Sequence, residues 1–124
     1  MNTVTVRLSL VIALLSTANS SLHAETQVPF GNVVSENVYR YHRHTPHLAT
    51  SGALGEGALE ELERHGFTTI IDLRTAQEGT ETAEQLARAT GFRYHNLPIA
   101  QDWPDESTIA SFARLVEDQS NYPI

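Results

Sequence analysis

The amino-acid sequence predicts an α/β domain in which a mainly parallel sheet is flanked by helices. Two segments, 67–74 and 92–97, are rich in large apolar, aromatic and β-branched residues, which is typical of strands. The first of them is apolar enough to be buried on both faces of a sheet. Segments with helical apolar spacing lie before, between and after them, and such alternation indicates parallel strands joined by helices.

The expected elements follow one another in a regular order. They are a strand over 38–41, a loop over 42–52, a helix over 56–65, the strand over 67–74, a loop over 75–79, a helix over 81–90, the strand over 92–97, a helix over 106–119 and the start of a strand over 122–124. The first helix has apolar residues on one face and charged residues on the other. Gly66 and Gly91 end the first two helices, and Thr82 with Gln85 predicts a capping box in the second.

The N-terminal residues are not predicted to belong to this domain. Residues 1–24 combine Arg7, an apolar run over 8–15 and an exit ending in Ala24, which together indicate a secretory signal peptide. Residues 25–36 are a polar lead-in that we expect to be flexible. The sequence therefore predicts one domain over 37–124, in a secreted or periplasmic protein.

Two alternatives remain open for this leader. Cleavage could follow Ala18 or Ser20 instead of Ala24, and the apolar run could serve as an N-terminal membrane anchor. The run is shorter than a bilayer-spanning helix requires, which favours the cleaved signal. After cleavage we expect no stable membrane association.

Composition limits the classes of function. The net charge is −7, so we expect no nucleic-acid partner, because binding to phosphates requires a basic surface. The chain of 124 residues contains no cysteine, which excludes disulfides and a cysteine nucleophile within it.

Several short motifs together resemble the superfamily of dual-specificity and tyrosine phosphatases. They are Val38-Tyr-Arg40, His65-Gly66, Thr69-Ile-Ile-Asp-Leu-Arg74 with Glu78, Gly91-Phe-Arg-Tyr-His95 and Leu97-Pro-Ile-Ala-Gln-Asp102. The bacterial branch described as phosphatases or sulfurtransferases, related to the domain of β-lactamase hydrolase-like proteins, is the most similar. The resemblance covers about residues 37–124 and implies a phosphatase-like fold.

The resemblance implies hydrolysis of phosphate monoesters on a phosphorylated small molecule or phosphoprotein, without cofactor or metal. In that family a strand and a His-Cys-x-x-Gly-x-x-Arg loop come next, and the cysteine thiolate attacks phosphorus. This chain stops where that strand would begin. We therefore expect an incomplete domain that lacks a central strand, folds poorly and is inactive as it stands; a degenerate relative is the other reading.

Two aspartates are candidates for the general acid that the resemblance implies. Asp102 follows a strand, at the position where the resembling phosphatases carry the acid. Asp105 is the alternative, in a Trp-Pro-Asp sequence like that of the tyrosine-specific branch. Asp105 also directly precedes a helix, with Thr108 three residues on, so an N-cap is its simplest structural role.

Three charged residues near the end of the first long strand are expected to support the site. Arg74 could face an anion, or it could form an ion pair with Asp72 or Glu78 that fixes the end of the strand. The resemblance implies that Arg74 and Glu78 support the active-site loop. Asp72 is expected to be part of a buried structural pair.

Two other functions remain alternatives. A rhodanese-like sulfurtransferase would use the same loop cysteine to carry a persulfide. A non-catalytic exported domain could instead bind an anion, or a metal through His42, His44 and His47. A metal site needs three or four converging ligands, and these histidines read more simply as part of a polar loop.

Overall fold

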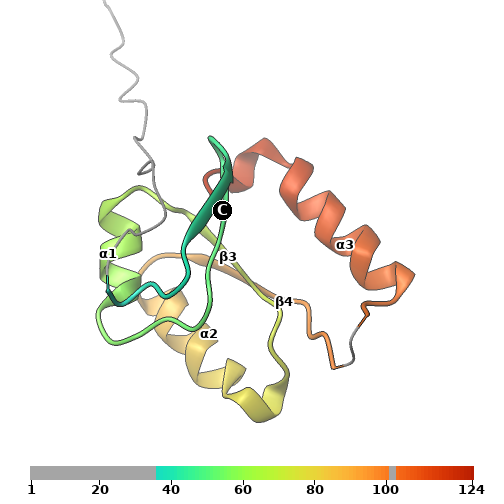
Figure 1. Ribbon diagram of the computed structural model, residues 1–124, viewed down its shortest axis with the longest axis horizontal. Coiled ribbons are helices and arrows are strands. Elements are labelled where there is room, and N and C mark those ends of the chain that lie inside the picture. The colour runs from blue at the N-terminus through green and yellow to red at the C-terminus, as the bar shows by residue number, and fades with distance from the viewer. Residues whose placement is uncertain (1–35, 101–102) are drawn as a thin grey trace, which may run out of the picture.

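The computed structural model describes residues 36–100 and 103–124 (Figure 1). The predicted signal peptide, most of the lead-in and Asp102 lie outside these residues. Within them, no helix combines the length and the apolar character needed to cross a membrane.

The described chain forms four short strands and three α-helices. In order these are β1 (His42–Thr45), β2 (Leu48–Thr50), α1 (Ala58–Arg64), β3 (Thr69–Asp72), the 3₁₀ turn η1 (Ala76–Glu78), α2 (Thr80–Ala89), β4 (Arg93–Asn96), α3 (Glu106–Glu117) and the 3₁₀ turn η2 (Gln119–Asn121). Strands β3 and β4 pair in parallel, whereas β1 and β2 form an antiparallel hairpin. The predicted α/β class is confirmed, but these residues hold two separate two-stranded sheets instead of one mainly parallel sheet.

The N-terminal part of the domain differs from the prediction. The predicted strand over 38–41 is wrong: Val38 forms only an isolated bridge with Leu54, and the strand begins at His42. Arg40 has a left-handed backbone (φ 54°), which interrupts an extended chain. The predicted loop over 42–52 is also wrong, because it contains β1 and β2. Strand β1 is polar and β2 has only three residues, so neither shows the apolar alternation that would identify it.

The helices lie close to their predicted positions, with one correction at a helix end. Helix α2 begins at Thr80 after Gly79 (φ 86°), so the predicted capping box of Thr82 and Gln85 is wrong. The capping box of this region is instead formed by Thr75 and Glu78 around η1. In contrast, Asp105 is the N-cap of α3, as predicted: its Oδ1 accepts a hydrogen bond from the Thr108 N–H at 2.7 Å.

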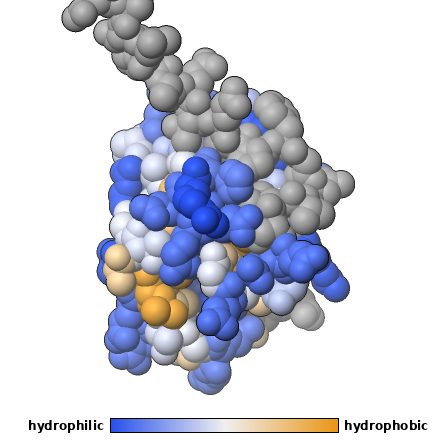
Figure 2. Space-filling view, turned by 90° about the vertical axis from the view of Figure 1, so that its left-hand side faces the viewer, coloured by the Kyte–Doolittle hydropathy of each residue, from blue (hydrophilic) through white to orange (hydrophobic). Residues whose placement is uncertain are grey.

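The core lies between the strands and the helices α1 and α2 (Figure 1). Its buried apolar side chains are Val38, Tyr41, Ala58, Leu62, Phe67, Ala87, Phe92 and Tyr94. Helix α3 lies on the other side of β3 and β4 and contains no buried residue, although its apolar residues have helical spacing. The outer side of α1 and α2 is largely hydrophilic, with one small apolar patch (Figure 2).

The last residues of the chain run between the two sheets. The Ile124 N–H donates to the His47 C=O at 2.8 Å, and the Ala49 N–H donates to the Ile124 C=O at 3.0 Å, a parallel pattern beside β2. On the other side, the Thr68 N–H donates to the Pro123 C=O at 3.0 Å. Residues 122–124 are not assigned as a strand, so the predicted start of a strand there is not confirmed, although Pro123 and Ile124 make strand-like hydrogen bonds.

Candidate functional site

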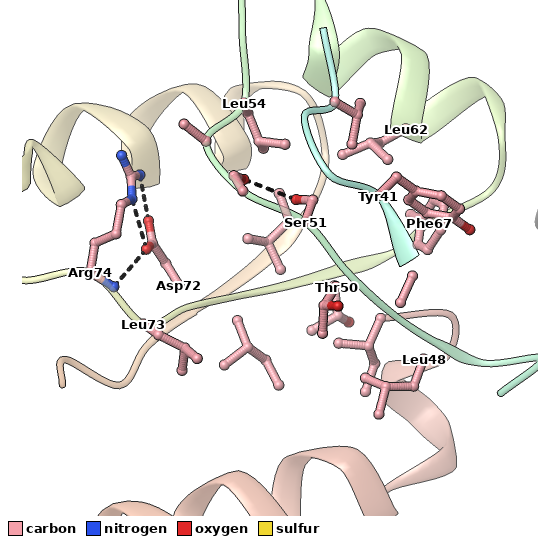
Figure 3. A pocket seen from close by; sticks show the side chains of 18 of the residues that line it. Tyr41, Leu48, Thr50, Ser51, Leu54, Leu62, Phe67, Asp72, Leu73 and Arg74 are labelled. Atoms are coloured by element: carbon pink, nitrogen blue, oxygen red, sulfur yellow. Dashed lines mark hydrogen bonds and ion pairs between the residues drawn. The ribbon is translucent and has the colours of Figure 1, made fainter. Parts of the chain in front are cut away.

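A bidentate ion pair lies at the carboxyl end of β3 (Figure 3). Arg74 Nη2 is 2.6 Å from Asp72 Oδ2, and Arg74 Nε is 3.0 Å from Oδ1. The backbone N–H of Arg74 also donates to Asp72 Oδ1 at 3.0 Å. Asp72 is buried, so this pair fixes the strand end, as one of the two sequence-based readings of Arg74 predicted.

Strand β4 supplies two more groups to this pair. The Tyr94 hydroxyl donates to Asp72 Oδ2 at 2.7 Å. The Asn96 side-chain amide donates to the backbone C=O groups of Asp72 (2.8 Å) and Arg74 (2.9 Å). We refer to Asp72, Arg74, Tyr94 and Asn96 as the Asp72 cluster. It joins the carboxyl ends of the two parallel strands, where ligands bind in open α/β sheets.

The hydrogen bonds within the Asp72 cluster favour the charged forms of Asp72 and Arg74. Burial alone would raise the pKa of Asp72, but the hydrogen bonds from Arg74 and Tyr94 outweigh burial and hold that pKa below its usual value. The hydrogen bond to Asp72 raises the pKa of Arg74 despite partial burial. Burial and the bond to Asp72 raise the pKa of the Tyr94 phenol. Asp72 therefore remains an ionised structural carboxylate and is a poor proton donor.

Glu78 supports the cluster indirectly. Its carboxylate accepts hydrogen bonds from the Thr75 N–H (2.7 Å) and hydroxyl (2.9 Å), which lower its pKa. Arg74 reaches only the backbone C=O of Glu78, with Nη1 at 3.4 Å from that oxygen. The loop after β3 is thus held by Glu78 through Thr75, and the ion pair of Arg74 is made with Asp72.

Of the two candidate acids, the structure describes one. Asp105 Oδ1 accepts hydrogen bonds from the Thr108 N–H and, at 2.8 Å, from the Ser107 hydroxyl. The bonds from Thr108 and Ser107 lower the pKa of Asp105. Asp102 lies outside the described residues, and the nearby Trp103 is 80% exposed.

The three histidines of the β1–β2 hairpin do not form one cluster. The rings of His42 and His44 lie 4.6 Å apart, and His44 Nε2 is 2.9 Å from the Thr50 hydroxyl. His47 instead stacks on Tyr122, with ring centroids 4.7 Å apart. Across residues 36–100 and 103–124, no group of three or more His, Asp or Glu side chains could hold a metal ion.

A cavity of about 410 Å³ separates β2 from β3 next to the Asp72 cluster (Figure 3). We call it the slot. Most of its lining is apolar, and Ile124 lies in it together with the Asp72 and Arg74 side chains at one end. Figure 3 shows the lining side chains between α1 and α2 on one side and α3 on the other. A second, more polar groove of about 450 Å³ runs between α2, β4 and α3.

No family model, no curated protein and no solved structure matches this chain.

The sequence indicates the charged members of the site, Asp72 and Arg74, but not the neutral ones, Tyr94 and Asn96. An aromatic residue and an amide within a strand are typical of packing and of solvated positions. The parallel register, which pairs Ile70 with Tyr94 and Asp72 with Asn96, brings both to Asp72. Tyr94 and Asn96 are two residues apart, so both point to the same face of their strand. This spacing, on the strand that follows one ending in Asp-x-Arg, is the signal that could have indicated them.

Proposed function

We propose that this chain provides the supporting framework of a phosphatase-like α/β domain that hydrolyses phosphate monoesters, and that it is inactive without a cysteine-containing loop. The substrate class is a phosphorylated small molecule or phosphoprotein, met outside the cytoplasm. One observation carries the proposal: the Asp72 cluster ties the carboxyl ends of two parallel strands, where an anion-binding loop would be supported.

The proposed chemistry assigns different roles to the acidic residues. A loop thiolate attacks phosphorus, the bond to the leaving oxygen breaks, and an acid protonates that oxygen; water then hydrolyses the cysteinyl phosphate. Asp105 is poorly suited to be the acid, because the N-cap hydrogen bonds stabilise its carboxylate. We therefore propose Asp102 as the acid and assign Asp72 and Arg74 to positioning the loop.

The other candidate functions have weaker support. Binding of a free anion at Arg74 is disfavoured, because Arg74 is paired with Asp72 and lies near Glu78. Two carboxylates and one guanidinium give this strand end a net negative charge, which repels an anion. A metal site is disfavoured, because His47 stacks on Tyr122 away from His42 and His44. Sulfur transfer uses the same framework and must be separated by experiment.

The first test uses the chain as it is. We expect no hydrolysis of p-nitrophenyl phosphate above buffer and no thiocyanate from thiosulfate and cyanide, because the chain has no cysteine. Turnover of p-nitrophenyl phosphate would contradict the proposed mechanism.

The second test adds a cysteine loop. A chimaera is made by adding, after Ile124, the strand, Cys loop and following helices of a phosphatase of the resembling family. We expect release of p-nitrophenol that is lost when the loop cysteine is replaced by serine. Asp102→Asn is expected to lower kcat by about 10²–10⁴-fold, whereas Asp105→Asn, which keeps the N-cap oxygen, leaves kcat nearly unchanged.

The outcomes of the second test separate the alternatives. Thiocyanate formation without phosphate release would favour sulfur transfer. A chimaera that folds but shows no cysteine-dependent phosphate release, or one in which Asp102→Asn has no effect, would overturn the proposed function or the assigned acid.

A further inference from the structure

We propose that the polar groove beside β4 binds an oxyanion, phosphate or carboxylate, that is carried on a small apolar group. The groove is the one of about 450 Å³ between α2, β4 and α3. It lies along the edge of β4 that does not pair with β3, whereas Ile124 bonds to β2 on the opposite side of β3. The groove is therefore separate from the slot, and the inference does not depend on the proposed function.

The lining of the groove carries an excess of positive charge. Arg88 of α2 and Arg114 of α3 contribute two guanidinium groups, and Glu84 is the single acidic side chain among the described residues that line it. The chain as a whole has a net charge of −7. Two cations that line one space repel each other, and an anion between them removes this repulsion. The groove is thus suited to an anion although the protein is acidic.

Arg114 offers free donors to such an anion. Its Nη2 donates to the Ser111 hydroxyl at 2.9 Å. In the described part of the chain, no carboxylate lies within ion-pair distance of Arg114. A guanidinium has five N–H donors, so most of those on Arg114 remain for a ligand. The Ser111 hydroxyl lines the groove beside it and adds a further polar group.

Arg88 is held over the edge of β4 from the other side. Its Nε donates to the Glu84 carboxylate at 2.8 Å, and its Nη2 donates to the Tyr94 C=O at 3.2 Å. These two bonds orient the guanidinium before a ligand arrives, which reduces the entropy that binding would cost. Among the described residues, Nη1 of Arg88 has no acceptor and is available to an oxyanion.

The edge of β4 adds backbone donors. The N–H groups of Arg93 and Leu97 donate to the segment of β3, so the alternation along the strand directs the N–H groups of Tyr94 and Asn96 to the groove. The Tyr94 C=O, which accepts from Arg88, agrees with this direction. Within the described residues, no strand pairs with this edge of β4. Backbone N–H and guanidinium groups are the donors that bind phosphate and carboxylate oxygens.

The size and the rest of the lining indicate what carries the oxyanion. Leu97 and Leu115 are half-buried apolar residues of the groove. His95 is also half-buried there, and a ring N–H of histidine can donate to an anion. The volume of about 450 Å³ lies in the range of sites for small organic ligands. We therefore expect a phosphate ester or carboxylic acid with a small aromatic or aliphatic group.

The experiment titrates the full chain with four probes and follows the backbone amides by NMR. The probes are phenyl phosphate, phenylacetate, inorganic phosphate and benzyl alcohol. We expect saturable shifts of the Tyr94, Asn96 and Leu115 amides with phenyl phosphate or phenylacetate, and the tighter of the two identifies the oxyanion. Binding should be at least fivefold weaker for inorganic phosphate, which lacks the apolar group, and for benzyl alcohol, which lacks the charge. Equal binding of benzyl alcohol, or shifts confined to the β1–β2 hairpin, would overturn the proposal.

Charge variants on the helices locate the site. Arg114→Gln is expected to weaken binding of the tighter probe about fivefold, because it removes a charged hydrogen-bond donor. Glu84→Gln should instead tighten binding about twofold, because it removes the carboxylate of the groove and releases Arg88. Arg64→Gln is the matched control, since Arg64 is exposed in the last turn of α1 and does not line the groove. It makes the same change in charge and should alter binding less than twofold.

Hydrogen exchange gives a second measurement, which does not require that the whole chain be well folded. The tighter probe should slow exchange of the Tyr94 and Asn96 amides about fivefold in the wild type, because only the folded edge of β4 binds it. The double variant Arg88→Gln/Arg114→Gln should show no such slowing. Unchanged exchange in the wild type would overturn the proposal. Equal weakening by Arg64→Gln and Arg114→Gln would overturn it as well, because net charge rather than the groove would then determine binding.

Discussion

Most of the hydrogen bonds at the site depend on the carboxylate of Asp72. It accepts hydrogen bonds from the Arg74 side chain and backbone and from the Tyr94 hydroxyl. Because it is buried, removing its charge leaves the guanidinium without its anionic partner and weakens the hydrogen bond that the phenol donates. Its role in stability can therefore be separated from that of exposed ion pairs.

Asp72→Asn is expected to destabilise the β3–β4 pair by about 2 kcal/mol at pH 7. The pKa of Asp72 is lower in the folded state than in the unfolded chain, where it is about 3.9. The carboxylate thus stabilises the fold above about pH 4, and this contribution is lost as the pH falls through the folded pKa. Amide protection factors in β3 should therefore differ between wild type and variant at pH 7 and converge toward pH 2.

The matched control for this prediction is Glu84→Gln. Glu84 pairs with Arg88 at 2.8 Å on the exposed side of α2, so its loss should cost little at any pH. An Asp72→Asn deficit that is the same at pH 7 and pH 2 would contradict the assigned charge state of Asp72.

Asp105 has a testable structural role at the residue scale. Asp105→Ala removes the acceptor for the Thr108 N–H and should destabilise α3 by about 1 kcal/mol, so that exchange in its first turn becomes about fivefold faster. Asp105→Asn should retain most of the protection, since Asn is an equally good N-cap. Equal losses in both variants would mean that the negative charge, rather than the cap hydrogen bond, stabilises α3.

At the scale of elements, Thr68 connects β3 to the last residues of the chain. Thr68→Val removes the hydroxyl that donates to Asn121 and Tyr122, and is expected to cost about 1 kcal/mol. We expect about fivefold faster exchange of the Ile124 and Ala49 amides, which hold this segment to β2. Thr90→Val is the control, because the Thr90 hydroxyl bonds only within α2 and its loss should leave these amides unaffected.

The elements also show which structural features the sequence could predict. The helices and the strands β3 and β4 follow from apolar spacing and from Gly66 and Gly91, because those signals are local. The hairpin did not follow, since residues 42–45 are polar and Arg40 takes a left-handed conformation that its residue type does not suggest. At the site, Asp72 and Arg74 are neighbours in sequence and could be paired in advance, whereas Tyr94 is 22 residues away from Asp72 and its contact depends on the parallel register.

For the molecule as far as the structure describes it, the slot and the absence of buried residues in α3 predict marginal stability. A small domain needs most of its apolar surface buried to offset the loss of chain entropy. We therefore expect far-UV circular dichroism of the chain to change gradually on heating, without a sharp transition. A cooperative transition with native-like helix and strand content would contradict this expectation, and with it the sequence-based view that the domain folds poorly.

The position of the two open strand edges has a consequence for aggregation. Unpaired edges usually promote intermolecular pairing, and proteins protect them with charged residues or by covering them. Here the inner edges of β2 and β3 both line the slot, which Phe112 of α3 also lines, so these edges are not on the open surface of a sheet. The outer edges differ: Arg43 lies on β1, and the Arg88 guanidinium donates to the Tyr94 C=O on β4 at 3.2 Å. The outer edges of the two sheets should therefore resist growth into fibrillar sheets.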